Sequence, residues 1–147
     1  MDRFPLASVV LLILSLAACG QDFELQTTEL ETNASGNLEI IVSNQSFEID
    51  AVDVHIRIDG KVAISDVFHV EGQHTFVAHT FQVAPGSHEL AIETDVGDAE
   101  LTASIETTAD KRWATVMFWY YPEGSGGDEP TPRQFSFNAS DEQPLFD

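Results

Sequence analysis

The clearest secondary-structure signal lies in residues 52–60, Val52-Asp53-Val54-His55-Ile56-Arg57-Ile58-Asp59-Gly60. Branched apolar residues alternate with polar ones through position 58, which is the period expected for a strand with one buried face. The Asp-Gly pair that follows accepts the positive φ angles of a two-residue type I′ turn. The stretch therefore predicts the first half of a β-hairpin.

The same alternation occurs on both sides of this hairpin, and helical periodicity is almost absent. Six other segments with apolar alternation are separated by turn-forming residues, at about 38–42, 62–67, 74–83, 90–92, 101–105 and 113–121. Short strands at such spacing are typical of an antiparallel β-sandwich. We expect an all-β sandwich of about seven to eight strands, in which Gln134 to Asn138 adds a strand or lies across the sheet.

The N-terminus carries an apolar run, Leu6 to Ala18, that ends at Cys19, the only cysteine of the chain. The run is too short to cross a bilayer comfortably, since spanning about 30 Å takes about 20 residues. A cleaved export signal is the better interpretation. The sequence Leu16-Ala17-Ala18-Cys19 resembles the lipobox of bacterial lipoproteins, which implies cleavage before Cys19 and lipid on its thiol. The alternative is an ordinary secretory signal with an incidental cysteine.

Lipidation would place the protein in the bacterial cell envelope without a transmembrane helix, because two or more acyl chains anchor a protein stably. Gly20 follows the cysteine, whereas such lipoproteins commonly carry aspartate there when they stay in the inner membrane. We therefore prefer the outer membrane, with the domain facing the periplasm or the cell surface.

The expected organisation has one domain. We expect a signal peptide at 1–18, the lipidated cysteine and a flexible tether at 19–37, and the β-sandwich at 38–122. An acidic loop rich in glycine and proline follows at 123–132, and residues 133–147 pack on the sandwich. The mature chain is long enough for one core. With no second cysteine, that core must hold without a disulfide.

A short motif resembles a known class of modules. Pro85-Gly86-Ser87-His88-Glu89-Leu90 enters a strand after a turn and resembles the Pro-Gly-x-His-x-Leu corner of bacterial immunoglobulin-like and PEGA-type modules. The resemblance covers about residues 38–121 and implies an immunoglobulin-like or fibronectin type III-like sandwich. The cysteines of a true immunoglobulin domain are absent, and such a fold does not imply a function.

Charge restricts the class of partner. The chain has 25 acidic and 6 basic residues, for a net charge of −19, and removing Asp2 and Arg3 with the leader leaves this charge unchanged. Nucleic acids and anionic lipid surfaces would be repelled. The charge favours solubility, cations or a basic partner, and it would also suit saline surroundings.

Metal and cofactor sites have little support. His69, His74 and His79 are five residues apart, so in an extended chain they alternate between faces and do not converge. We expect His88 to hydrogen-bond a neighbouring backbone group at its corner. Because calcium prefers oxygen ligands on loops, a weak candidate cation site is Asp95, Asp98 and Glu100, with a solvated acidic turn as the alternative.

Catalytic motifs are also missing from the sequence. It contains no nucleophile elbow, no His-Glu-x-x-His and no glycine-rich phosphate loop. We expect no catalytic residues and no cofactor, and thus a protein that is not an enzyme.

The segment 113–121 offers a candidate binding face. Ala114, Val116, Phe118 and Tyr120 suit a core face, which leaves the other face to Trp113, Met117, Trp119 and Tyr121. Exposed aromatic rings stack on sugars or anchor protein partners. The alternative is that Phe135, Phe137 and Phe146 cover this face from within the chain.

Two functions follow from these features. The preferred one is a membrane-anchored interaction or structural module that presents a sheet edge or an apolar patch to another envelope protein. The alternative is a glycan-binding module that uses Trp113, Trp119 and Tyr121.

Overall fold

The computed structural model describes residues 28–70, 75–125 and 129–146. The expected signal peptide, Cys19, His74 and the first part of the expected tether lie outside these residues. Within the described ranges, no helix is long and apolar enough to cross a membrane. The chain forms eight strands: β1 (Leu38–Asn44), β2 (Ala51–Ile58), β3 (Lys61–His69), β4 (Val77–Phe81), β5 (Gly86–Thr94), β6 (Ala99–Thr107), β7 (Arg112–Tyr121) and β8 (Thr131–Ser140).

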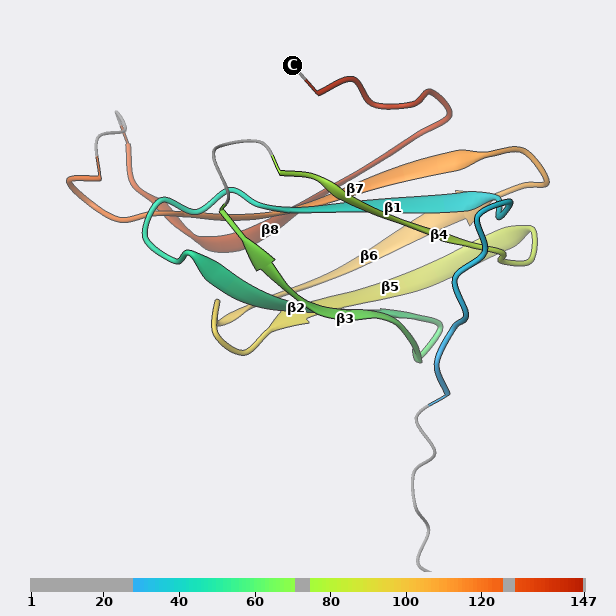
Figure 1. Ribbon diagram of the computed structural model, residues 1–147, viewed down its shortest axis with the longest axis horizontal. Helices are drawn as coiled ribbons and strands as arrows, with labels where there is room; N and C mark the ends of the chain where they lie inside the picture. The colour runs from blue at the N-terminus through green and yellow to red at the C-terminus, as the bar shows by residue number, and fades with distance from the viewer. Residues whose placement is uncertain (1–27, 71–74, 126–128, 147) are drawn as a thin grey trace, which may run out of the picture.

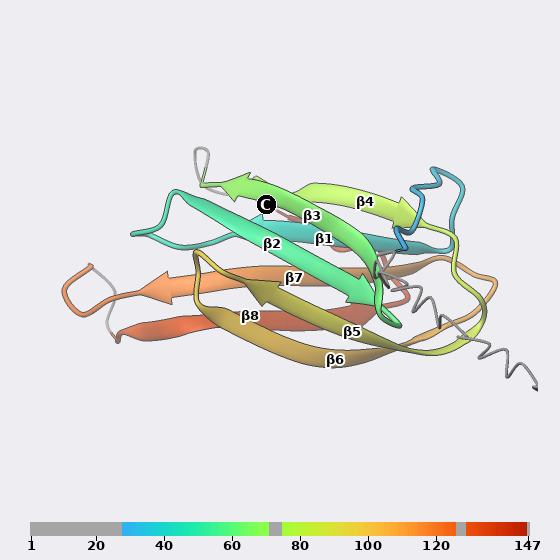
Figure 2. The ribbon, with the colours of Figure 1, turned by 90° about the horizontal axis from the view of Figure 1, so that it is seen from below.

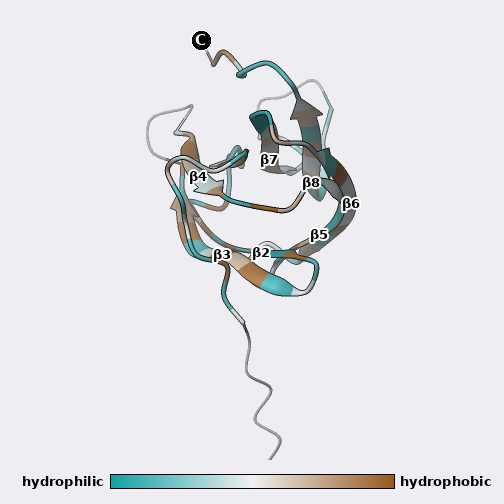
Figure 3. Cartoon of the chain, turned by 90° about the vertical axis from the view of Figure 1, so that its right-hand side faces the viewer, coloured by the Kyte–Doolittle hydropathy of each residue, from teal (hydrophilic) through white to brown (hydrophobic). Residues whose placement is uncertain are grey.

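The strands form two stacked sheets (Figure 1), one in the order β4-β1-β7-β8 and the other in the order β3-β2-β5-β6. Seen from below (Figure 2), the second sheet lies in front of the first and its strands are inclined to those behind. The end-on view (Figure 3) shows β4 above β3 along one side and β8 beside β6 along the other. The expected two-sheet sandwich is confirmed.

One strand pair differs from the expected antiparallel arrangement. β1 and β7 are parallel neighbours, with a register that runs from Leu38↔Arg112 to Asn44↔Phe118. Parallel neighbours need a long crossover connection, and here the five strands β2 to β6 provide it. The prediction of a wholly antiparallel sandwich is therefore wrong at this pair, because local alternation carries no information about the direction of a distant partner.

The apolar faces predicted from the alternation form the core. Every predicted inward position on β1 and β2 is at most 3% exposed, as are three positions on β7: Leu38, Ile40, Val42, Val52, Val54, Ile56, Ile58, Ala114, Val116 and Phe118. At about 25 cal/mol per Å² of apolar surface removed from water, this burial is the main stabilising contribution in a fold without a disulfide.

The turn between β2 and β3 has the predicted geometry. Asp59 has a φ of 50° and Gly60 a φ of 78°, and these two residues connect Ile58 to Lys61 in the antiparallel register. Positive φ at both positions is the requirement of a type I′ turn.

The structured domain begins before β1. Leu30 N–H donates to Val62 O at 2.7 Å, and Asn33 N–H donates to Thr80 O at 2.7 Å. Residues 28–33 therefore run along the outer edges of β3 and β4, at the right-hand end in Figure 1. Part of the segment expected as a flexible tether is thus hydrogen-bonded to the domain.

The C-terminal region adds the expected strand. β8 pairs with β7 along its length, from Trp113↔Ser140 to Tyr121↔Thr131. The described parts of the acidic loop lie between these two strands. Beyond β8, Arg112 pairs with Asp141, which ties the start of the C-terminal tail to β7.

Candidate functional site

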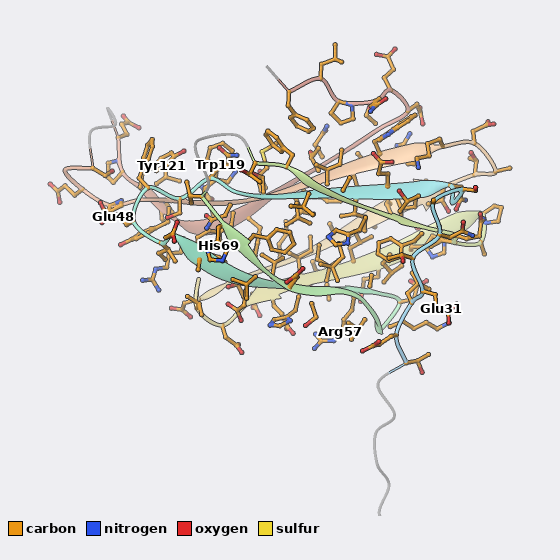
Figure 4. The ribbon with its side chains drawn as sticks, viewed as in Figure 1. Glu31, Glu48, Arg57, His69, Trp119 and Tyr121 are labelled. Carbon is orange, nitrogen blue, oxygen red and sulfur yellow. The ribbon has the colours of Figure 1, made fainter. Side chains whose placement is uncertain are left out.

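Three aromatic rings gather at one end of the sandwich. Phe47 comes from the β1–β2 connection, and Trp119 and Tyr121 come from the end of β7 (Figure 4). The ring centroids of Phe47 and Tyr121 are 4.5 Å apart with planes at 33°, and those of Trp119 and Tyr121 are 6.0 Å apart at 81°. We call this group the aromatic notch.

The notch borders a pocket of about 300 Å³, which is large enough for one amino-acid side chain. Its lining consists of the three rings, the start of the β1–β2 connection and the residue after β3: Asn44, Gln45, Ser46, Phe47, Val70, Trp119 and Tyr121. Phe47 is 58% exposed. An apolar ring this open, at the mouth of a pocket, is available for contact with a ligand.

The backbone of the β1–β2 connection is fixed from two sides. Gln45 N–H donates to Phe118 O, and Phe47 N–H donates to Tyr120 O, so the connection continues along β7. Asn44 is 4% exposed; its Nδ2 donates to Phe68 O at 3.1 Å and its Oδ1 accepts from Ser46 N–H at 3.0 Å. Phe47 is thus held by a loop whose buried groups are hydrogen-bonded.

The two β7 rings are also positioned. Trp119 Nε1 donates to Ser136 Oγ at 2.8 Å, which fixes the indole against β8. Burial raises the pKa of Tyr121 above its ordinary value, so the phenol stays neutral in the physiological range. The notch is uncharged and largely preformed.

The structure divides the predicted aromatic face. Trp119 and Tyr121 lie at the notch, and Met117 lies on the same outer face between Ser43 and Ser136. Trp113 is eight residues from Tyr121, about 26 Å along the strand, and its neighbour on β8 is Ser140. Phe47 was missed, because single exposed apolar residues in polar loops are common and carry little information.

The predicted aromatic cover does not form. Phe135 and Phe137 are in register with Phe118 and Val116. Directly opposed residues share a face of the sheet, so both phenylalanines lie on the core side. Phe146 instead stacks on Phe76, with centroids 3.7 Å apart. The alternative that these three residues bury the aromatic face is therefore wrong.

The acidic turn between β5 and β6 forms a different cluster from the predicted one. Ligand atoms of Asp53, His55 and Asp95 lie within 4.8 Å of one another, and Asp98 and Glu100 are not part of this group. Asp53 accepts hydrogen bonds from the Thr94 hydroxyl, the Val96 and Asp95 amides, and His55. Burial alone would raise the pKa of Asp53, but these bonds lower it below 3.8.

Those bonds give the Asp53 carboxylate a structural role. Both of its oxygens already accept two donors, and two of these donors are backbone amides of the turn. A metal ion would have to displace bonds that hold the turn in shape. The arrangement thus supports the alternative of a solvated acidic turn over a cation site.

The described histidines do not converge on one point. His88 lies at the predicted corner: its Nε2 is 2.7 Å from Ala84 O and its Nδ1 is 2.6 Å from Asp59 Oδ2. Since both partners are acceptors, both ring nitrogens donate, and the bond to Asp59 raises the pKa of His88. The expected hydrogen bond from His88 to a neighbouring backbone group is confirmed.

His79 contrasts with His88 in its surroundings. Its ring meets Phe68 edge to face, and its Nε2 is buried without a hydrogen-bond partner in the described part of the chain. Burial lowers the pKa of His79, so its neutral form is favoured.

Comparison of this chain with family models, curated proteins and solved structures found no match.

Proposed function

We propose that this protein is a lipid-anchored module of the bacterial cell envelope that binds another envelope protein and performs no catalysis. The aromatic notch carries this proposal: Phe47, Trp119 and Tyr121 border a pocket on the surface of a strongly acidic domain. Aromatic rings in well-formed pockets are the side chains most often responsible for protein binding energy.

The placement of the notch supports an anchored binding module. The N-terminal segment joins the domain near Glu31, at the end opposite Glu48 and Tyr121 (Figure 4). Cys19 precedes Thr28 by nine residues, which reach at most about 30 Å. A lipidated Cys19 would hold one end of the sandwich near the membrane and leave the notch at the far end.

An apolar patch is a better binding surface here than the edge strand β3. Along β3, Val62 already exchanges backbone hydrogen bonds with Thr28 and Leu30. Further along, Asp66 Oδ1 accepts from Val67 N–H at 2.8 Å. Side-chain carboxylates on an edge strand oppose pairing with another chain, so this edge is protected against strand addition.

We also propose that β1 to β6 form an immunoglobulin-like core. Their sheet order matches immunoglobulin strands B, C, C′, E, F and G, with β1–β4 and β2–β5 as the antiparallel pairs that correspond to B–E and C–F. His88 lies two residues before buried Leu90 and bonds Ala84 O, as the tyrosine corner of that fold does near strand F. The parallel strand β7 and its partner β8 are additions to this core.

Glycan binding fits the geometry less well. The planes of Trp119 and Tyr121 meet at 81°, so the two rings do not form a flat platform for successive sugars. Trp113, the third ring of that hypothesis, lies near the other end of β7. Binding of oligosaccharides by the full chain, with loss in Trp119→Ala, would reverse this preference.

Site-specific photo-crosslinking in native cells tests the proposal. A photoreactive amino acid at position 47 is compared with the same probe at Ser87, an exposed residue at the opposite end. We expect position 47 to capture one envelope protein, position 87 not to capture it, and capture to require Cys19. Equal capture at both positions, or none from position 47, would overturn the proposal.

Lipidation and location are tested separately. We expect mass spectrometry to find a diacylglyceryl group on Cys19 and an N-terminus at this residue, and membrane fractionation to place the protein with the outer membrane. An unmodified Cys19 in the secreted chain would support the incidental cysteine instead.

A further inference from the structure

We propose that the aromatic notch receives a cationic side chain, arginine or lysine, from the partner protein. This inference rests on the proposed function and names the chemistry that the partner must present.

The ring geometry favours a compact group over a flat one. The planes of Phe47 and Trp119 are inclined to the plane of Tyr121 by 33° and 81°, so the three rings form the walls of a recess. Cations are attracted to the faces of aromatic rings within about 6 Å of the centroid. A guanidinium or ammonium group on a long side chain fits a pocket of about 300 Å³.

Charge complementarity points to the same occupant. Among the described residues, no lysine, arginine or histidine lines the pocket. Glu48 and Asp50 are exposed in the same β1–β2 connection and Glu123 is exposed just after β7, although Asp50 also lies 3.6 Å from His69 Nδ1. Arg57, Lys111 and Arg112 are paired with acidic residues. The notch therefore combines aromatic faces, nearby carboxylates and a net charge of −19, which together attract a cation.

The protein contains one such contact within its own chain. The guanidinium carbon of Arg133 lies 5.0 Å from the ring centroid of Tyr120, the residue before Tyr121. A neighbouring ring of the same strand thus already stacks with a cation.

Two small probes test the inference on the full chain in a non-ionic detergent. N-acetyl-arginine methylamide carries one positive charge, and N-acetyl-citrulline methylamide is its neutral analogue of nearly equal shape. The background variant Trp113→Phe makes Trp119 the only fluorescent indole, since the chain has two tryptophans. We expect the arginine probe to bind about fivefold more tightly or better, from the usual strength of such contacts.

Matched variants locate the effect. Phe47→Ala and Glu48→Gln should reduce the preference for arginine, whereas Val67→Ala, at an apolar residue 51% exposed elsewhere, and Glu106→Gln, on β6, should preserve it. Equal binding of the two probes, or a preference that survives Phe47→Ala, would overturn the inference. Binding of tetramethylammonium without the arginine probe would also overturn it, in favour of a quaternary ammonium headgroup.

The two proposals can fail independently. If position 47 crosslinks to an envelope protein but the two probes bind equally, the proposed partner binding is supported and the cationic contact is contradicted. If arginine is preferred but no partner is captured, the pocket binds cations and the proposed function falls.

Discussion

A buried asparagine lies at each end of the β1 region, and the two ends of the sandwich use these side chains for different purposes. At the end near residues 28–33, Asn37 donates to Val83 O and Thr108 O and accepts from Val83 N–H. At the opposite end, Asn44 holds the β1–β2 connection through Phe68 O and Ser46 N–H. Both are at most 5% exposed.

The difference lies in what each asparagine supports. Around Asn37, the neighbouring groups form a closed polar corner in which His88 bridges Ala84 and Asp59. Around Asn44, the supported loop presents Phe47 to solvent beside Trp119 and Tyr121. Satisfied buried groups give a rigid frame in both places, but the loop held by Asn44 also leaves a phenylalanine ring, Phe47, 58% exposed.

The largest effect among the polar substitutions is expected from Asn37→Ala. This change leaves the N–H of buried Val83 without its acceptor and removes the donor to Val83 O and Thr108 O, at a cost of about 3 kcal/mol in the free energy of unfolding. Urea unfolding followed by circular dichroism measures it. Asn138→Ala, at an exposed position of β8, is the control and should change stability by less than about 0.5 kcal/mol. Equal small effects of both changes would contradict the assigned role of Asn37.

Asn44→Ala should be somewhat milder for stability but more damaging for the notch. It removes the donor to Ile49 O, Asp50 O and Phe68 O and the acceptor of Ser46 N–H, for a loss of about 2 kcal/mol. Because the same bonds position Phe47, we also expect the aromatic contact with Tyr121 to loosen. Chemical shifts of the Tyr121 ring protons measure this, and Asn37→Ala should leave them unchanged in the folded protein.

Part of this comparison could be predicted from the sequence. The apolar faces, the Asp59-Gly60 turn and the His88 corner follow from local patterns, and the structure has them as expected. The parallel β1–β7 pair and the inward direction of Phe135 depend on the pairing of distant segments. A shift of one residue moves a side chain to the other face, so the aromatic cover could not be assigned without the β7–β8 register.

The candidate site shows the same limit. Trp119 and Tyr121 were found from strand alternation, but Phe47 lies in a connection where alternation gives no signal. The buried role of Asn44 was equally hidden, because a polar residue at a strand end resembles any other turn residue. Only the fold brings the β1–β2 connection and the end of β7 together.

The His88 corner gives a pH-dependent test. His88→Ala should cost about 1–2 kcal/mol through lost hydrogen bonds to a carboxylate and a carbonyl. Because the folded pKa of His88 is raised above 6.5, its contribution is complete below pH 6.5 and is lost as pH rises through the folded value. The stability difference between wild type and variant should therefore be larger at pH 6 than at pH 9. A difference that does not vary with pH would show that His88 is not charged at this corner.

His79 should give the opposite dependence. Its folded pKa lies below 6.5 because of burial, so wild type loses stability as pH falls below 6.5, where the unfolded chain binds a proton that the folded chain resists. His79→Leu removes this loss. The stability of the variant relative to wild type should therefore increase as the pH falls from 7 to 5. Urea unfolding midpoints at both pH values test this prediction. A variant that is less stable relative to wild type at pH 5 than at pH 7 would contradict the lowered pKa of His79.

The smallest change in stability is expected from Phe47→Ala, although it should have the largest effect on binding. Phe47, in the β1–β2 connection, is 58% exposed, whereas Phe118, on β7, is fully buried. Phe118→Ala should cost about 3–5 kcal/mol through a core cavity, whereas Phe47→Ala should cost less than about 1 kcal/mol. A loss of about 2 kcal/mol or more at position 47, which approaches the size of a core effect, would mean that the ring belongs to the fold. A near-neutral change combined with a lost preference for the arginine probe would mean that the Asn44 end keeps Phe47 exposed for binding, because the domain itself gains little from the ring.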